Sequence, residues 1–312
     1  MSLCLVTGGI GFIGSHLVDK LIAQGNQVRV LDNLASGHLE NIAPNLGEID
    51  FVEGDIRDES IVHQAMADVD YVFHLAAMVS VPQSMVQPKQ AESINTIGTL
   101  NILEAAKSAG VRRVVLSSTC AIYGDEPTLP KIETMFPQPQ SPYAISKLAA
   151  EQYCQLFAAA FGLETVVLRY FNVFGPRQDP SSPYSGVISI FVDKMFQDLP
   201  VTIFGTGEQT RDFVFVSDVV RANLLAAKAP DAAGQIFNIG TGRAVTINQL
   251  FQSLSTLLDH KLESNYEPAR PGDVLHSYAD SRRARSILKW QPQINFELGL
   301  STLVESLRLG SG

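Results

Sequence analysis

The sequence predicts an α/β fold, with a doubly wound parallel sheet and a second, smaller mixed α/β domain. Three observations indicate this fold class. Short apolar runs typical of buried strands alternate with helical stretches through the first half of the chain. A glycine-rich turn at 8–14 follows the first apolar run directly. The length of 312 residues corresponds to about two domains at roughly 150 residues each.

The elements of the first half follow one another at a spacing that favours parallel strands joined by helices. The first helix has apolar side chains at helical spacing and ends at Gly25 and Asn26. We expect strands at Leu3–Thr7, Gln27–Leu31, Asp50–Val52, Tyr71–Leu75, Val114–Ser117 and Thr165–Leu168. We expect helices at Ser15–Gln24, Glu59–Ala67, Ile94–Ala109 and Tyr143–Phe161.

The pattern changes after about Phe174, where Gly175–Gly186 reads as a long loop with three prolines. Shorter elements follow it: strands at Val201–Phe204, Phe213–Val216 and Gln235–Ile239, and helices at Val187–Gln197, Asp218–Lys228, Thr246–Leu258, Ser281–Leu288 and Leu298–Leu309. We therefore predict a cofactor-binding domain at 1–173, to which elements at about 213–240 return. Residues 174–212 and 241–312 form the predicted substrate-binding domain.

Composition restricts the class of function. The chain has 32 acidic and 23 basic residues, and this net charge of −9 disfavours nucleic acid and anionic membranes as partners. It has no apolar run of about 18 residues and no export signal near Met1. The three cysteines are widely spaced, which is typical of reduced thiols in the cytoplasm, and the six histidines form no metal-binding pattern. We expect a cytoplasmic enzyme without a metal.

A dinucleotide site is indicated by Gly8, Gly11 and Gly14, which lie between a strand and a helix. Glycine permits the tight turn and lets backbone amides approach a pyrophosphate at the helix N-terminus. Asp32 ends the second strand, where a carboxylate hydrogen-bonds the adenosine ribose. It would repel a 2′-phosphate, so NAD is favoured over NADP. Asp55 and Ile56, after the third strand, would suit the adenine edge.

A catalytic base is indicated by Tyr143 and Lys147, which share one face at the start of a helix. The lysine ammonium would stabilise the phenolate and lower the pKa of the tyrosine from about 10, and a cationic nicotinamide ring would lower it further. Hydroxyl side chains at 117–119 follow the fifth strand, at the sheet edge where ligands bind. One of them can hydrogen-bond the sugar oxygen that the tyrosine deprotonates.

Together these motifs resemble the extended short-chain dehydrogenase/reductase family, and within it the UDP-sugar 4-epimerase group. The resemblance extends over nearly the whole chain and rests on TGGIGFIG at 7–14, HLAA at 74–77, NTIGT at 95–99, SPY at 141–143, RYFNVFG at 169–175, RDF at 211–213 and RPGD at 270–273. It implies a Rossmann-type fold, NAD as cofactor, a UDP-sugar as substrate and a homodimer built on Ile94–Ala109 and Tyr143–Phe161.

The resemblance also implies residue roles. Thr119 would supply the catalytic hydroxyl, Tyr143 the base, and Lys147 its partner and a contact to the nicotinamide ribose. Beyond the glycine loop and Lys147, the implied cofactor contacts are Phe12, Ile13, Asp32, Asn33, Ser36, Gly37, Asp55, Ile56, Leu75, Ala76, Ala77, Asn95 and Phe171. Asn172, Arg211 and Arg270 would hold the substrate diphosphate, and Asp273 the uridine ribose.

Two positions bear on the reaction and the sugar. Related dehydratases and decarboxylases carry carboxylates where this chain has Cys120 and Ala121, so we expect chemistry to stop at reversible oxidation of one carbon. Epimerisation would then proceed through a 4-keto sugar. Ser277 is small at the position of the sugar gate and is permissive for an N-acetyl group. Arg177 could instead pair with a uronic acid, which leaves UDP-glucuronate 4-epimerisation open, as are a net keto-sugar reductase and a non-catalytic NAD sensor.

Overall fold

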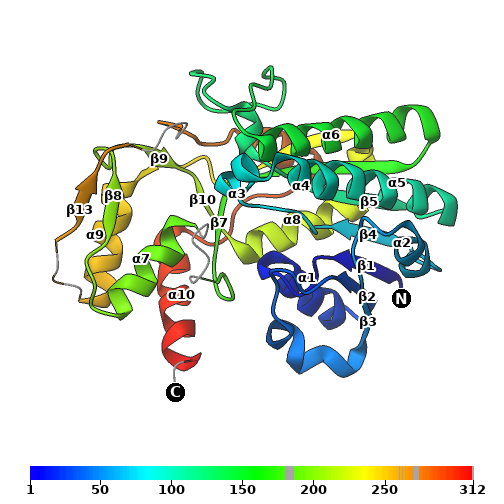
Figure 1. The fold of residues 1–312 in the computed structure, drawn as a ribbon, viewed down its shortest axis with the longest axis horizontal. Helices are drawn as coiled ribbons and strands as arrows, with labels where there is room; N and C mark the ends of the chain where they lie inside the picture. The colour runs from blue at the N-terminus through cyan, green and yellow to red at the C-terminus, as the bar shows by residue number, and fades with distance from the viewer. Residues whose placement is uncertain (180–185, 260, 262, 270–273, 311–312) are drawn as a thin grey trace.

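The computed structural model describes residues 1–179, 186–259, 261, 263–269 and 274–310. Its largest element is a seven-stranded sheet in the order β11-β6-β5-β4-β1-β2-β3, and every neighbouring pair is parallel (Figure 1). The predicted doubly wound parallel sheet is therefore confirmed. The strands are β1 (Leu3–Thr7), β2 (Gln27–Asp32), β3 (Ile49–Glu53), β4 (Tyr71–His74), β5 (Arg113–Thr119), β6 (Glu164–Tyr170) and β11 (Gln235–Ile239).

The strand order reverses beside β1, because β2 lies on one side of it and β4 on the other. The register pairs Thr7 of β1 with both Leu31 and His74, so the carboxyl ends of these three strands meet at one edge. Ligands of open α/β sheets bind at such a switch point. The glycine turn at 8–14 begins directly there.

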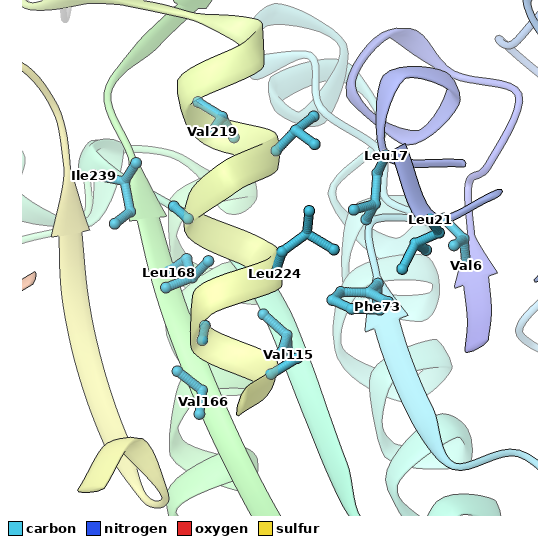
Figure 2. Close-up of a cluster of buried hydrophobic side chains, with 14 of the residues drawn as sticks. Val6, Leu17, Leu21, Phe73, Val115, Val166, Leu168, Val219, Leu224 and Ile239 are labelled. Carbon is cyan, nitrogen blue, oxygen red and sulfur yellow. The ribbon is translucent and has the colours of Figure 1, made fainter. Parts of the chain in front are cut away.

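Helices cover both faces of the sheet, since neighbouring residues of each strand point to opposite sides. On one face α1 (Phe12–Ala23) and α8 (Val216–Lys228) share a buried cluster with alternate strand residues. Figure 2 shows Val219 and Leu224 of α8 in this cluster, beside Leu168 of the sheet. The opposite face is covered by α2 (Glu59–Ala65), α5 (Gly98–Ala109) and α6 (Pro142–Phe161).

A third buried cluster lies outside the sheet and is rich in aromatic rings. Phe174 meets Phe215 edge-on, with ring centroids 5.5 Å apart. The elements around it are α7 (Val187–Phe196), α9 (Ile247–Leu258) and α10 (Phe296–Gly310), with the short strands β7 (Asn172–Phe174), β8 (Thr202–Phe204), β9 (Thr210–Arg211), β10 (Phe213–Phe215), β12 (Val245–Thr246) and β13 (Asn265–Glu267). The division into two domains stays a prediction, and Trp290 packs with the cluster on the sheet instead.

Several local predictions differ from the structure. Helix α1 begins at Phe12, not at 15, because Gly11 already occupies the N-cap position. The predicted helix Ile94–Ala109 is a π-helical turn, η2 (Ser93–Ile97), followed by α5, and Ser281–Leu288 contains a similar turn, η5 (Ala284–Leu288). The sequence reading missed η1 (Leu39–Glu48), α3 (Val81–Val86), α4 (Pro88–Glu92), η3 (Cys120–Tyr123) and η4 (Pro230–Ala232), all shorter than three helical turns of regular α-helix.

Within the described ranges, no helix is both long enough and apolar enough to cross a membrane.

Candidate active site

The glycine turn forms a backbone cradle that side chains would fill. Gly8 has a φ of +70°, and its carbonyl accepts a hydrogen bond from the amide of Gly11 at 3.1 Å. A Cβ atom at Gly14 would lie 2.1 Å from that carbonyl oxygen. No side chain caps the N-terminus of α1, where Phe12 and Ile13 begin the helix. The turn therefore fits a pyrophosphate held by backbone amides.

Asp32 lies beside this cradle, at the end of β2. One carboxylate oxygen accepts the Ile10 amide at 3.3 Å, and the other accepts the Leu34 amide at 3.0 Å. Burial raises the pKa of Asp32, although these amides oppose the shift. The loop that follows contains the exposed Asn33 and Ser36 and returns to the cradle, where a Cβ atom at Gly37 would lie 3.0 Å from the amide nitrogen of Gly11.

Asp55 is joined to this loop by a side-chain hydrogen bond of 2.8 Å from Asn33. Arg57 also donates to both Asp55 oxygens, at 2.8 and 2.7 Å, and these bonds hold the pKa of Asp55 well below its usual range. Ile56 is buried, and its carbonyl accepts the Asn101 amide group at 3.1 Å. The adenine contact proposed for Asp55 and Ile56 stays a prediction, and the Asp55 carboxylate is already shared by two donors.

The segment after β4, Leu75–Ala77, is half-buried and lies against the end of β1. The Ala76 amide donates to the Thr7 hydroxyl at 3.1 Å. The His74 ring lies between two hydroxyls, 2.7 Å from Thr7 Oγ1 and 2.9 Å from Thr99 Oγ1. Burial lowers the pKa of His74 to about 3, so the ring is neutral and ties β1, β4 and α5 together.

Asn95 holds the continuation of this segment against α6. Its side-chain oxygen accepts the Met78 amide at 2.8 Å, and its nitrogen donates to Met78 O and to the Ser146 hydroxyl, both at 3.0 Å. Asn95 was predicted as a cofactor contact, and its side chain here joins the loop after β4 to the helix that carries Tyr143. That role gave no sequence signal because the partners are distant along the chain.

The predicted catalytic residues are brought together at the start of α6. Ser141 caps this helix by accepting the Ala144 amide at 3.2 Å, and Pro142 opens it. Tyr143 in the first turn shares a side-chain hydrogen bond with Thr119 at the end of β5. Lys147 lies one turn further along the same face and is buried.

The protonation of this pair differs from the prediction. Burial raises the pKa of Tyr143 to about 12, although its hydrogen bond with Thr119 lowers it. The expectation that Lys147 brings the pKa of the tyrosine below 10 is therefore wrong for the protein chain, because the cost of desolvating a phenolate is larger. Burial also lowers the pKa of Lys147 to about 8, against the attraction of Glu151.

The predicted sugar wall lies next to Thr119. Cys120 shares a side-chain hydrogen bond with Ser277, and Arg211 is close enough to act on the charge of the thiol. Burial raises the pKa of Cys120 to about 11, so it is a neutral thiol. Ser277 is 8% exposed, and its amide donates to the Thr210 carbonyl at 3.2 Å.

The remaining predicted substrate residues have different outcomes. Phe171 is buried beside this wall, and Asn172 starts β7 with a buried Oδ1 that has no partner among the described residues. Arg177 pairs with Asp19 of α1 at 2.8 Å and is not brought to Ser277, so the arrangement gives no support to a uronic acid contact. Arg270 and Asp273 lie outside the described residues.

Sequence reasoning missed the role of Asp212, which organises the loops around this wall. Its carboxylate is fully buried and accepts four hydrogen bonds. The donors are the Thr241 amide at 2.8 Å and hydroxyl at 2.5 Å, the Gly242 amide at 2.8 Å and the Ala279 amide at 3.0 Å. Its only sequence signal was the RDF match at 211–213.

A parallel sheet with a glycine cradle, an acid at the end of β2 and a tyrosine–lysine helix defines an NAD-binding enzyme of the extended short-chain dehydrogenase/reductase type. The model of the NAD dependent epimerase/dehydratase family matches residues 4–240, and the chain belongs to this family. NAD is its cofactor.

Three solved structures are similar over nearly the whole chain. UDP-glucose 4-epimerase from Thermotoga maritima, solved with UDP-glucose, is 45% identical with a TM-score of 0.95 and covers 99% of this chain and 100% of its own. UDP-N-acetylglucosamine 4-epimerase from Methanobrevibacter ruminantium, in complex with UDP-N-acetylmuramic acid, is 38% identical with a TM-score of 0.95 and covers 99% of both chains. Thermus thermophilus UDP-glucose 4-epimerase, in complex with NAD, is 38% identical with a TM-score of 0.91 over 98% of this chain and 99% of its own.

Proposed function

We propose that this chain is a UDP-hexose 4-epimerase, which interconverts the gluco and galacto configurations of UDP-glucose, UDP-N-acetylglucosamine, or both. The observation that carries the proposal is the hydrogen bond between Tyr143 and Thr119 at the sheet edge, with Lys147 one turn away. The names of the similar structures agree with it. The neutral Cys120, in place of a carboxylate, favours a reaction that stops at oxidation and reduction of one carbon.

The chain's own residues would divide the proton work. Tyr143 would take the proton of the sugar 4-hydroxyl, and Thr119 would hold the same oxygen through its hydroxyl. Lys147, when protonated, favours the phenolate form of Tyr143. NAD, when bound, supplies the hydride acceptor and donor at carbon 4, and its positive ring further favours phenolate. The return of the proton from Tyr143 restores the starting protonation, so no net redox change results.

The substrate diphosphate needs cationic and amide donors. We propose Arg211 and Asn172 for this role, together with Arg270, and Asp273 for the uridine ribose. Asn172 supports its own assignment by a buried polar atom that lacks a partner among described residues. Gly8, Gly11, Gly14, Asp32 and the segment Leu75–Ala77 would hold NAD, because they line the switch point of the sheet.

The direct test is turnover without an external reductant. The purified protein is incubated with UDP-glucose and with UDP-N-acetylglucosamine, with no NADH added, and the products are identified by NMR. Epimerisation predicts the galacto product from at least one sugar. Formation of product only when NADH is added would assign a net reductase instead, and no product under either condition would remove the proposal.

The size of residue 277 is expected to control the choice between these sugars. Ser277→Tyr places a large ring where Ser277 now contacts Cys120, and it should reduce kcat/KM for UDP-N-acetylglucosamine at least about tenfold more than for UDP-glucose. The measurement is the ratio of the two kcat/KM values. Ser277→Ala, which keeps the space, serves as the matched control, and an equal loss for both sugars in the tyrosine variant would contradict this role.

We propose a homodimer formed through α5 and α6. These helices pack side by side at one edge of the molecule (Figure 1). Ile145 and Leu156 of α6 are 52% and 48% exposed, and they lie eleven residues apart, which is about three helical turns and hence one face. Ile97, at the start of α5, is 47% exposed. An apolar surface across two helices suits a second copy of the chain.

Leu156→Glu is expected to convert this dimer into a monomer, because it places a carboxylate in an apolar contact. Sedimentation velocity measures the outcome. Leu298 of α10 has a similar exposure of 50%, so Leu298→Glu is the control and should leave the sedimentation coefficient unchanged. A dimer that survives Leu156→Glu would place the interface elsewhere.

We also propose a cytoplasmic location. Cys4, Cys120 and Cys154 are all free thiols, as expected for a reducing compartment.

A further inference from the structure

A buried ion pair lies one helical turn beyond Lys147, and the mechanism above does not use it. The side chains of Glu151 and Arg169 are 0% and 3% exposed. The Arg169 guanidinium donates to both carboxylate oxygens, with Nη2 2.7 Å from Oε2 and Nε 3.0 Å from Oε1. Removing two ions from water costs several kcal/mol each, so stability alone is a weak reason for such a pair.

The same carboxylate reaches the strand that carries Thr119. Glu151 Oε1 accepts the Ser118 hydroxyl at 2.5 Å. The sheet register places Ser118 of β5 directly opposite Arg169 of β6, so Glu151 binds two neighbouring strands at once. Thr119, the hydrogen-bond partner of Tyr143, is the next residue along β5.

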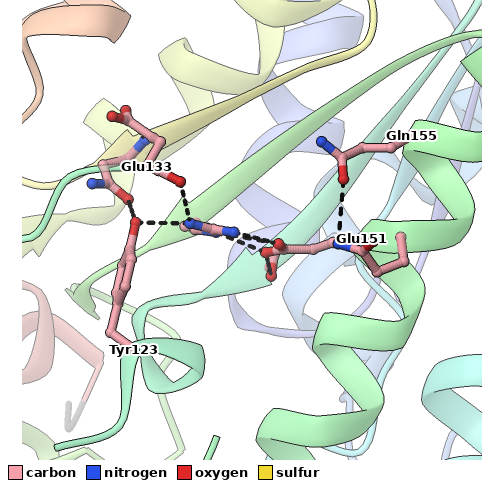
Figure 3. Close-up of polar contacts among 8 residues, drawn as sticks. Tyr123, Glu133, Glu151 and Gln155 are labelled. Atoms are coloured by element: carbon pink, nitrogen blue, oxygen red, sulfur yellow. Dashed lines mark hydrogen bonds and ion pairs between the residues drawn. The ribbon is translucent and has the colours of Figure 1, made fainter. Parts of the chain in front are cut away.

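The arginine extends the cluster to the segment after Thr119. Arg169 Nη1 donates to the Tyr123 hydroxyl at 2.9 Å, and that hydroxyl donates to Asn238 at 2.7 Å. Nη1 also donates to the Glu133 carbonyl at 3.3 Å. Figure 3 shows Tyr123 and Glu151 on opposite sides of this cluster, with Glu133 above. The pair thus joins α6, both strands and η3.

The helix places the charges in a row. Tyr143, Lys147 and Glu151 are four residues apart in turn, so all three lie on the face of α6 that meets the sheet. Glu151 is the nearest carboxylate that favours the protonated form of Lys147. Its own charge is shared with Arg169 across the helix–sheet contact.

We propose that Glu151 is a positioning residue for the epimerase reaction: held by Arg169 and Ser118, it keeps Lys147 protonated and fixes α6 against the strand that carries Thr119. The proposal rests on the proposed function. Its consequence is that the Tyr143–Lys147 pair reads the net charge of the Glu151–Arg169 pair.

The other titratable groups around this row do not change charge between about pH 5 and 9. On β4, burial lowers the pKa of His74 to about 3. On α6, burial raises the pKa of Cys154 far above its usual value. In η3, burial raises the pKa of Tyr123 to about 12 and that of Cys120 to about 11. Lys147 and Tyr143 are therefore the groups whose titration the test follows.

The test measures the pH dependence of kcat in the NAD-loaded enzyme. Glu151→Gln removes a negative charge and leaves Arg169 unbalanced, so protonated forms of Lys147 and Tyr143 become less favourable. Both limbs of the profile should move to lower pH, the alkaline limb by about 1 unit or more because Lys147 is the nearer group. In the double variant Glu151→Gln, Arg169→Gln, the net charge is restored, and the limbs should return toward the wild-type positions.

A matched control is the pair of Glu164 and Arg113, 2.5 Å apart at the far end of β6. Glu164→Gln should leave both limbs in place. Arg169→Gln is the second single variant, and it leaves the negative charge of Glu151 unshared, so its limbs should move to higher pH. Unmoved limbs in whichever single variant folds would overturn the proposal, as would shifts of the same sign in both.

A readout without substrate separates this inference from the proposed function. Tyrosinate absorbance is titrated in the NAD-loaded protein as the difference between each protein and its Tyr143→Phe counterpart. Glu151→Gln should move the Tyr143 midpoint to lower pH even if no UDP-sugar is turned over. An unmoved midpoint would reject the positioning role, and a lack of turnover in the wild-type protein would reject only the function.

Discussion

Replacing Tyr143 with phenylalanine is expected to lower kcat for epimerisation about a thousandfold. The substitution removes the hydroxyl that is hydrogen-bonded to Thr119 and keeps the ring, which is half-buried at the start of α6. Thr119 alone cannot accept the proton, because an alcohol is a much weaker acid than a phenol. The measurement is the initial rate of galacto-product formation from UDP-glucose, followed by NMR.

The variant should bind NAD and unfold at the wild-type temperature, because the cradle at Gly8–Gly14 and the packing of α6 are unchanged. Its matched control is Tyr266→Phe, at an exposed tyrosine of β13 whose hydroxyl donates to Asn248 at 3.1 Å. That control should keep full activity. A Tyr143→Phe enzyme with wild-type turnover would remove Tyr143 from the proposed role of base.

Where the chemistry depends on local sequence, the sequence alone predicted it. The glycine spacing at 8–14 and the acid at position 32 are determined by a strand, a turn and a helix that are adjacent in the chain. The four-residue spacing of Tyr143 and Lys147 similarly follows from the geometry of one helix. These features therefore stand where the sequence placed them, at the edge of the parallel sheet.

The organising residues could not be predicted in this way, since each acts on partners far along the chain. His74 bridges Thr7 and Thr99, and Asp212 reaches Ala279. Glu151 contacts Ser118 and Arg169. The raised pKa of Tyr143 was missed for a related reason: the expectation counted the nearby lysine, whereas the shift is dominated by burial, which depends on the whole fold.

Asp212→Asn is expected to be the most destabilising of the conservative substitutions discussed above, at about 3–5 kcal/mol. An asparagine has nearly the same shape, but its amide nitrogen cannot accept hydrogen bonds. Of the four donors on the carboxylate, those of Gly242 and Ala279 share the Oδ2 atom. If the new nitrogen takes that place, two buried amides lose their acceptor and face a further donor. Urea unfolding of wild-type and variant protein measures the difference in free energy.

The same substitution should weaken substrate binding, because Asp212 lies between Arg211 and β10 and fixes the segment that leads from Ser277 to Ala279. KM for the UDP-sugar should rise more than kcat falls, since Thr119 and Tyr143 belong to other elements. Asp50→Asn is the control: Asp50 is paired with Arg29 at 2.6 Å, but its side chain is 56% exposed, so about 0–1 kcal/mol is expected. An Asp212→Asn protein as stable as this control would mean that the loops around the sugar wall are held by other contacts.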